Sequence, residues 1–278
     1  MSSIRIDLSE KNNPQCLKDC DRIKREEFAE NYLCKIAKSI DDGLPVRCVG
    51  EWAQEKIYFL RREFEIFANG MKNKWDIGYF EIGCGPGRCI DRKTGKEFDG
   101  TALAILKSTA INNIKIARFI DIQDEAINAL TFRINALSLS HKVAAIKGDY
   151  TDGQFLADII SQNHNGLNLV FIDPTDCSVP FSTIQKMNKS GVRFDIIINI
   201  STKTDFTRNI KFAIESPSSD VRKKYELFLG NKNFFASENL LSAIKSEDYK
   251  TARILFVEEY QKMLTTLGFK YFGREQIH

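Results

Sequence analysis

The stretch from Tyr79 to Arg88, YFEIGCGPGR, holds residues whose types and spacing could serve chemistry. Its core is an acidic residue followed by three alternate glycines: Glu81, Gly83, Gly85 and Gly87. The aromatic and apolar run that leads into it predicts a buried parallel strand. Alternate glycines let the backbone turn sharply and approach a ligand closely, so we expect ligand atoms where side chains would stand. Glu81 can accept hydrogen bonds from a cationic ligand. A glycine-rich turn without a ligand is the alternative.

Two more predicted strands end in acidic residues that could hold a nucleoside. Asp121 ends the strand at 117–121 and is followed by Ile122. A carboxylate has two acceptor oxygens, so Asp121 can bind both hydroxyls of a ribose. After the strand at 143–146, Asp149 can accept a hydrogen bond from an adenine amine, and Tyr150 can flank the ring. The carboxyl ends of parallel strands are where open α/β sheets bind ligands.

The glycine loop differs from the dinucleotide-binding Gly-x-Gly-x-x-Gly, because Arg88 stands where the third glycine would be. Four motifs follow separate predicted strands, in the order EIGCGPG, FID at 119–121, GD at 148–149 and DP at 173–174. This ordered set resembles class I S-adenosylmethionine (SAM) methyltransferases. The resemblance implies an α/β, Rossmann-like class I methyltransferase fold with a mostly parallel, doubly wound sheet. It also implies SAM as the cofactor, bound by the glycine loop, Asp121, Ile122, Asp149 and Tyr150.

A narrower resemblance, over about residues 50–278, is to the three-Cys-motif partner (TcmP) proteins. The matching residues are Trp52, Glu55-Lys56, GPGR at 85–88, Gly100 to Leu103, Phe171 to Pro174, Asp195 to Asn199, Arg208-Asn209, Tyr260, Leu264 and Gly268. The resemblance implies a partner, a radical-SAM-like protein that carries three cysteines. The chain departs from the family at Gly83-Cys84-Gly85 and at DPTD (173–176), so the cofactor site matches better than the substrate site.

Asp173 and Pro174 end the fourth predicted strand, 167–172, where the acceptor of a methyl group usually lies. The Asp173 carboxylate and the Pro174 carbonyl could accept hydrogen bonds from an amine, which resembles enzymes that methylate base amines. Thr175 and Asp176 follow, so the stacking aromatic of those enzymes is missing. A proline-containing turn is the alternative interpretation.

The function predicted from these residues is SAM-dependent methyl transfer, or SAM binding by a close relative. The leading acceptor is an amine of a nucleic-acid base, with a small molecule or a peptide as alternatives. Asp173 and Pro174 are the catalytic candidates, and Arg208 and Lys96 the substrate-binding candidates. The contrasting class is a non-catalytic partner protein that keeps the pocket for binding. We expect no metal site.

The rest of the chain is expected to frame this site. Residues 76–278 are predicted to form the Rossmann-like domain, and residues 1–75 an N-terminal helical extension. Apolar residues at helical spacing predict helices from Lys24 to Ile40 and from Glu51 to Gly70. Residues 89–100 are expected to be a polar loop. A short last strand over 269–277 would give the main sheet no more than six strands.

The composition is that of an ordinary globular protein. The 278 residues are 43% hydrophobic and 28% charged, with a net charge of +3. That charge lacks the strong basic excess of a dedicated nucleic-acid binder but permits nucleic acid as a substrate. Seven cysteines without a repeating pattern argue against a disulfide framework, so a reducing, cytoplasmic location is expected. No apolar run is long enough to span a bilayer, and the N-terminus lacks a secretory signal.

Overall fold

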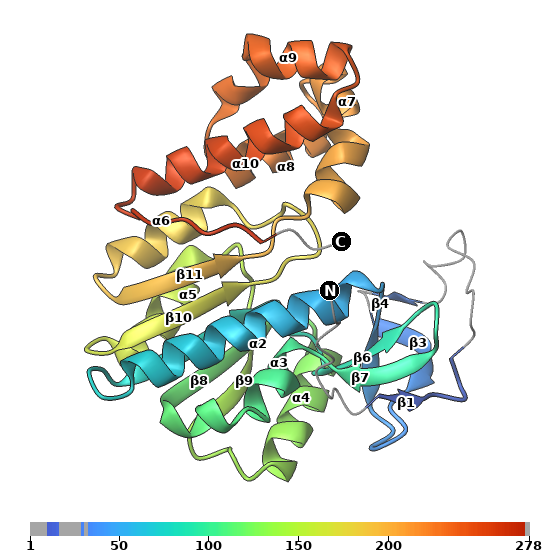
Figure 1. Cartoon of the computed structure of the whole chain (residues 1–278), viewed down its shortest axis with the longest axis vertical. Helices are drawn as coiled ribbons and strands as arrows, with labels where there is room; N and C mark the ends of the chain where they lie inside the picture. Colours follow the sequence, from blue (N-terminus) through green and yellow to red (C-terminus); the bar gives the residue numbers. More distant parts are fainter. Residues whose placement is uncertain (1–9, 17–28, 31–32, 276–278) are drawn as a thin grey trace, which may run out of the picture.

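A five-stranded parallel sheet forms the centre of the protein (Figure 1). The computed structural model describes residues 10–16, 29–30 and 33–275. The sheet order is β11-β10-β5-β8-β9, with bounds β5 Ile77–Ile82, β8 Ile114–Asp121, β9 Val143–Lys147, β10 Leu167–Ile172 and β11 Arg193–Ile198. Counted along the chain, this is the order 3-2-1-4-5 of a Rossmann-like doubly wound sheet. The predicted α/β fold class is therefore confirmed.

Each strand of the sheet sends alternate side chains into two separate cores. Tyr79 and Phe119 pack on one face with the helices α2 (Trp52–Met71), α3 (Thr101–Leu106) and α4 (Asp124–Ala136). Their neighbours Phe80 and Ile120 pack on the other face, against α5 (Gly153–Ile160) and α6 (Phe181–Lys189). Because both faces are covered, the strands are mainly apolar, although β8 carries Lys115 and Arg118 and the edge strand β11 carries Arg193 and Asp195.

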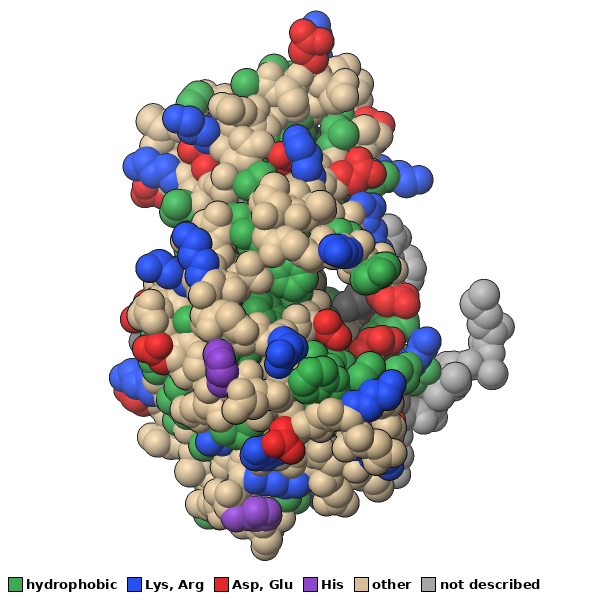
Figure 2. Space-filling view, turned by 90° about the vertical axis from the view of Figure 1, so that its left-hand side faces the viewer, with side chains coloured by type: hydrophobic (Ala, Val, Ile, Leu, Met, Phe, Trp, Pro, Cys, Tyr) green, Lys and Arg blue, Asp and Glu red, His purple; other side chains and the backbone are tan. Residues whose placement is uncertain are grey.

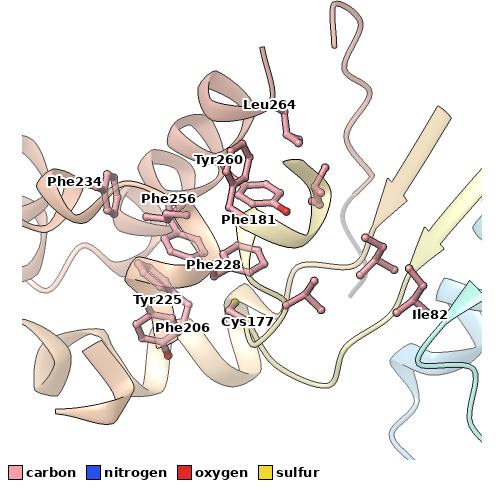
Figure 3. Close-up of a cluster of buried hydrophobic side chains, with 14 of the residues drawn as sticks. Ile82, Cys177, Phe181, Phe206, Tyr225, Phe228, Phe234, Phe256, Tyr260 and Leu264 are labelled. Carbon is pink, nitrogen blue, oxygen red and sulfur yellow. The ribbon is translucent and has the colours of Figure 1, made fainter. Parts of the chain in front are cut away.

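A group of carboxy-terminal helices extends the second core. These helices are α7 (Thr207–Glu215), α8 (Asp220–Leu229), α9 (Glu238–Lys245) and α10 (Tyr249–Thr265). Short 3-10 turns lie at Thr109–Asn113, Ser161–Asn163 and Lys232–Ala236, and a π-helical turn lies at Thr202–Phe206. Figure 3 shows the aromatic rings that hold the group together: Phe228 stacks on Tyr260 with ring centroids 4.5 Å apart, and Phe206 stacks on Phe256 at 4.1 Å. These contacts fix the helices beyond β11.

The predicted helix from Glu51 to Gly70 is confirmed as α2, but a second sheet, of shorter strands, replaces the helix predicted before it. Its order is β1-β7-β6-β4-β3-β2, with bounds β1 Lys11–Asn12, β2 Ala29–Glu30, β3 Leu33–Lys38, β4 Pro45–Val49, β6 Arg88–Asp91 and β7 Lys96–Asp99. The predicted helix from Lys24 to Ile40 is wrong where it can be compared, because 33–38 is a strand; residues 17–28 and 31–32 lie outside the described residues. The pairing of β3 with β4 shifts register between Leu33 and Lys38. The buried residues of β3 are Leu33 and Ala37, four residues apart, and positions four apart share a face in a strand as well as in a helix.

The predicted polar loop at 89–100 is instead a β-hairpin of this small sheet. β6 and β7 pair antiparallel, and β6 also pairs parallel with β4. The turn between them is closed by Asp91, whose Oδ1 accepts hydrogen bonds from the backbone N–H groups of Lys93 and Thr94 at 2.8 Å. Gly95 follows at a positive φ of 69°. The small sheet therefore takes strands from both sides of the predicted boundary at residues 75 and 76.

The predicted last strand is wrong over the residues that the structure describes. Residues 269–275 form no strand, and residues 276–278 lie outside the described part. Phe269 contacts β11 through a ring contact with Phe194 (5.7 Å between centroids), without a backbone ladder. The main sheet accordingly has five strands in the described chain, within the predicted limit of six. Within the same residues, no helix is long and apolar enough to cross a membrane.

Two buried arginines hold the β3–β4 turn, Arg88 from within the small sheet and Arg133 from the main domain. Arg88 donates to Glu97 (2.8 Å) and Asp99 (2.7 Å), and also to Asp41 of the β3–β4 turn (3.1 Å). Arg133 of α4 holds the adjacent Asp42 with two hydrogen bonds of 2.7 and 2.9 Å, and it donates to the carbonyl oxygen of Pro86 in the glycine loop. The β3–β4 turn is thus fixed against the loop by charged, bidentate contacts.

Replacement of Asp42 by asparagine should destabilise the protein strongly. The change leaves the Arg133 guanidinium, whose side chain is 4% exposed, without its carboxylate partner. A buried charge that loses its partner costs about 3–5 kcal/mol of unfolding free energy, measurable by urea denaturation. The matched control is Asp76→Asn, which breaks a pair with Lys115 in which both side chains are 61% exposed and should cost less than about 1 kcal/mol. Equal losses in the two variants would contradict the docking role of Arg133.

Candidate functional site

The three glycines after β5 are shaped by the protein's own groups. Gly83, Gly85 and Gly87 all have positive φ, between 62° and 88°, which L side chains rarely adopt. A Cβ at Gly83 would lie 2.7 Å from the carbonyl oxygen of Asp173, and one at Gly85 would lie 3.1 Å from the Arg47 guanidinium carbon. The expectation that ligand atoms stand at these positions is therefore corrected. Gly83 and Gly85 make room for β10 and β4, and Gly87 packs against leucines of α3 and α4.

Asp121 lies beside the glycine loop at the carboxyl end of β8, as predicted. Its Oδ2 accepts a hydrogen bond from the Gly85 N–H at 2.8 Å, and its Oδ1 accepts one from the Gln123 N–H at 3.0 Å. Each oxygen keeps a second lone pair for another donor. The Arg47 Nη2 lies 3.7 Å from Oδ2, beyond hydrogen-bond distance. The carboxylate is thus fixed in orientation and retains acceptor capacity.

Glu81 lies behind the loop, fully buried. Its carboxylate accepts hydrogen bonds from the Tyr79 hydroxyl at 2.8 Å and from the Thr101 hydroxyl at 2.5 Å. Burial raises the pKa of Glu81 to about 7, although these two hydrogen bonds oppose the rise and the nearby Asp173 adds to it. A carboxyl group in this position can influence a ligand through its charge.

Asp173, the predicted catalytic residue, has partners on both carboxylate oxygens. Lys56 of α2 donates to Oδ2 at 2.5 Å, and Asn199 at the end of β11 donates to Oδ1 at 2.9 Å. Lys56 also lies over the Trp52 ring, 5.0 Å from its centroid. The Asp173 side chain is 4% exposed, and Pro174 is buried. The carboxylate therefore lies inside a three-residue polar network that joins α2, β10 and β11.

The remaining cofactor candidates lie at the same edge of the sheet. Ile122 is 46% exposed directly after Asp121. Gly148 donates its N–H to the Asp121 carbonyl oxygen at 3.0 Å, which places the turn after β9 beside β8. In that turn Asp149 is exposed and accepts two hydrogen bonds from Thr151. The Tyr150 hydroxyl lies 3.0 Å from the Ser178 hydroxyl. These positions agree with a ligand that extends from the glycine loop towards β9.

The two substrate-binding candidates are not brought to this cluster. Lys96 begins β7, where its ammonium pairs with Glu10 at 2.8 Å. Arg208 is exposed in the first turn of α7. In the described part of the chain, no hydrogen bond or ion pair links either side chain to the glycine loop, Asp121 or Asp173.

Three residues of the site escaped the sequence-based prediction of site residues: Arg47, Lys56 and Asn199. Asn199 was predicted to lie within a strand over 194–200, whereas β11 ends at Ile198 and places Asn199 at the carboxyl edge. Lys56 was noted only as one of the residues that match the TcmP family. Helical periodicity does not predict which polar side chain of a helix contacts the end of a strand. Arg47 belongs to a strand that the sequence did not reveal.

Comparison with known proteins gives only distant similarities. No family model matches the chain, and no curated protein matches it. Among solved structures, SAH-bound methyltransferase PaMTH1 from Podospora anserina is 11% identical over 78% of this chain and 80% of that one, with a TM-score of 0.37. The O-methyltransferase from Bacillus cereus in complex with SAH is 12% identical over 66% and 79%, with a TM-score of 0.33. A SAM-dependent methyltransferase from Clostridium acetobutylicum ATCC 824 is 15% identical, with a TM-score of 0.33, and the match spans 51% of this chain and 50% of that one. The fold assignment therefore rests on the strand order and not on these similarities.

The raised pKa of Glu81 predicts a pH-dependent stability. Below the ordinary value of 4.5 the group is protonated in both the folded and unfolded states, so its favourable contribution is complete. Between 4.5 and about 7 the unfolded chain releases the proton while the folded protein retains it, and stability is lost as the pH rises. Urea denaturation from pH 4 to 8 should show the wild type losing stability relative to Glu81→Gln across this window. Parallel curves for the two proteins would exclude a protonated Glu81 in the folded state.

The network around Asp173 predicts a strong energetic coupling with Lys56. Either Asp173→Asn or Lys56→Met leaves one buried charge unpaired and should cost about 3–5 kcal/mol. The double variant removes both charges, so its loss should be clearly smaller than the sum of the single losses. A double-mutant cycle by chemical denaturation measures this. Additive losses would show that the two charges act independently.

Proposed function

We propose that this protein binds SAM and is a SAM-dependent methyltransferase. The observation that carries the proposal is the position of Asp121, with each carboxylate oxygen fixed by one backbone N–H at the carboxyl end of β8. Asp121 lies beside the glycine loop that follows β5. In the 3-2-1-4-5 order β5 is strand 1, and Rossmann-like proteins bind nucleosides at the carboxyl end of this strand. The order of the four sequence motifs supports the same assignment.

The charges at this edge fit a cationic cofactor. Three carboxyl groups gather there, from Glu81, Asp121 and Asp173, beside two cations, from Arg47 and Lys56, and Glu81, whose pKa is raised to about 7, would ionise more readily beside a bound cation. SAM, which carries a sulfonium and an ammonium group, supplies an electrophilic methyl group when bound. Asp121 would bind the ribose hydroxyls, and Asp149 and Tyr150 would lie at the adenine end. Glu81 would favour the cationic end through its negative charge, since a nearby cation stabilises its ionised form.

A methyl acceptor would lie near Asp173 and Pro174. The leading candidate remains an amine of a nucleic-acid base, with a small molecule or a peptide as alternatives. Because Lys56 and Asn199 already donate to the Asp173 carboxylate, Asp173 would act on an acceptor with its remaining lone pairs. Arg208 and Lys96 would meet only an acceptor large enough to extend beyond the strand ends. The face at the amino ends of the strands, seen in Figure 2, shows basic and acidic side chains interspersed.

One observation favours a second function, a non-catalytic SAM-binding partner. The closed network of Asp173, Lys56 and Asn199 leaves the expected acceptor carboxylate engaged within the protein. On this alternative the chain would keep the cofactor pocket and act with a radical-SAM-like three-Cys-motif protein, as the TcmP resemblance implies. Transfer of a labelled methyl group from SAM to a cell extract depleted of this protein would support catalysis. Cofactor binding without any such transfer would support the partner role.

The cofactor assignment predicts that Asp121→Asn weakens binding of S-adenosylhomocysteine (SAH). The substitution removes the charge from both ribose contacts, each worth about 1.5–3 kcal/mol when charge-assisted. We expect at least a 10-fold loss of affinity in isothermal titration calorimetry. The control is Asp124→Asn, a 67% exposed carboxylate three residues along, which pairs with Lys147 and should leave the affinity unchanged. Wild-type protein that binds neither SAM nor SAH would refute the proposed function.

A further inference from the structure

Arg47 of β4 lies across the glycine loop, close to the proposed ribose site. A Cβ built on Gly85 would lie 3.1–3.3 Å from three atoms of the Arg47 guanidinium group. The guanidinium therefore lies flat against the backbone of the loop that we assign to the cofactor. Gly85 is the residue that permits this approach, since any side chain there would collide with the guanidinium.

The hydrogen-bonding groups of Arg47 are unusually unsatisfied. A guanidinium has five N–H donors, yet no described residue accepts a hydrogen bond from Arg47, and its Nε is buried without a partner. The nearest carboxylate, Asp121, is 3.7 Å away and already accepts two backbone hydrogen bonds. Arg88 and Arg133, the other arginines beside this loop, each donate to at least three acceptors. A buried donor without an acceptor costs about 1–3 kcal/mol, which marks Arg47 as a residue that awaits an acceptor.

The surrounding structure fixes the backbone from which the Arg47 side chain extends. The turn that precedes β4 is fixed at Asp41 by Arg88 and at Asp42 by Arg133. β4 itself pairs in parallel with β6, with Arg47 opposite Cys89 directly after the glycine loop. The side chain is therefore presented to the loop by two buried ion pairs and a strand ladder.

We propose that Arg47 is a cofactor-binding residue that takes the carboxylate of the amino-acid end of SAM. This inference rests on the proposed function. The carboxylate is the only anionic group of SAM, and a planar guanidinium with free N–H groups matches a carboxylate with two parallel hydrogen bonds. The same contact would satisfy the donors of Arg47 and would draw the amino-acid end of the ligand across Gly85.

The test compares two ligands that differ only in this carboxylate. SAH carries it, whereas decarboxylated SAH, S-adenosyl-3-thiopropylamine, keeps the nucleoside, the sulfur and the amine. In isothermal titration calorimetry, Arg47→Gln should lower the affinity for SAH by about 10- to 100-fold and that for decarboxylated SAH by less than about threefold. Arg47→Lys, which keeps the charge without the planar pair of donors, should lie between wild type and Arg47→Gln for SAH.

The matched control is Arg118→Gln on β8, whose side chain lies towards the amino ends of the strands and away from the glycine loop. Arg118 is a half-buried arginine with neutral acceptors only, and it lines a hollow of about 200 Å³ away from the loop. This variant should bind both ligands as the wild type does. Equal losses of affinity for the two ligands in Arg47→Gln would overturn the inference and assign Arg47 to the support of Asp121. Unchanged affinities for both ligands would also overturn the inference. Wild-type protein that binds neither ligand would instead refute the proposed function itself, and the inference with it.

Discussion

The close approach of four chain segments to the glycine loop is the constraint on which the rest of the structure depends. β10 reaches the loop through the carbonyl oxygen of Asp173, β4 through the Arg47 guanidinium, and the two helices α3 and α4 through leucine side chains. Each approach is possible only because a glycine stands at the contact, with a backbone conformation that other residues rarely adopt. The loop is therefore a packing centre as well as the floor of the candidate site.

This constraint explains why ionic groups are concentrated around the loop. Segments that pack so closely carry polar side chains into a region with little water, where an unpaired charge is costly. These charges therefore form ion pairs: Arg133 with Asp42, Arg88 with Glu97, and Lys56 with Asp173. Glu81 has hydroxyl donors in place of a direct cationic partner, and burial raises the pKa of its carboxyl group although these hydrogen bonds oppose the rise. The site thus combines satisfied ion pairs that fix its frame with a few groups that keep capacity for a ligand.

The sequence predicted the main domain well because its signals are local. Apolar runs followed by polar ends located β5, β8, β9 and β10, and the motif order predicted the edge where Asp121 and Asp173 meet the glycine loop. The small sheet was missed because Leu33 and Ala37, four residues apart, share a face in a strand as well as in a helix, so their spacing did not separate the two. The partners of Asp173 were missed because α2 and β11 lie far from it in sequence, and only the fold brings Lys56 and Asn199 to its carboxylate. Contacts of this kind depend on tertiary packing, for which a single sequence has no periodic signal.

The parallel pairing of β4 with β6 has a consequence for how the chain can be divided. Between these neighbouring strands the chain runs through α2, crosses the main sheet as β5 and turns through the glycine loop. The small sheet is thus formed by segments that precede β5 in the sequence and segments that follow it. The two sheets are consequently not modules that could be cut apart at one linker or exchanged between proteins. Any boundary between β4 and β6 would leave the β6–β7 hairpin without its parallel neighbour. A boundary before the glycine loop would also separate Arg47 from Gly85. The segment before β5 is therefore part of the site.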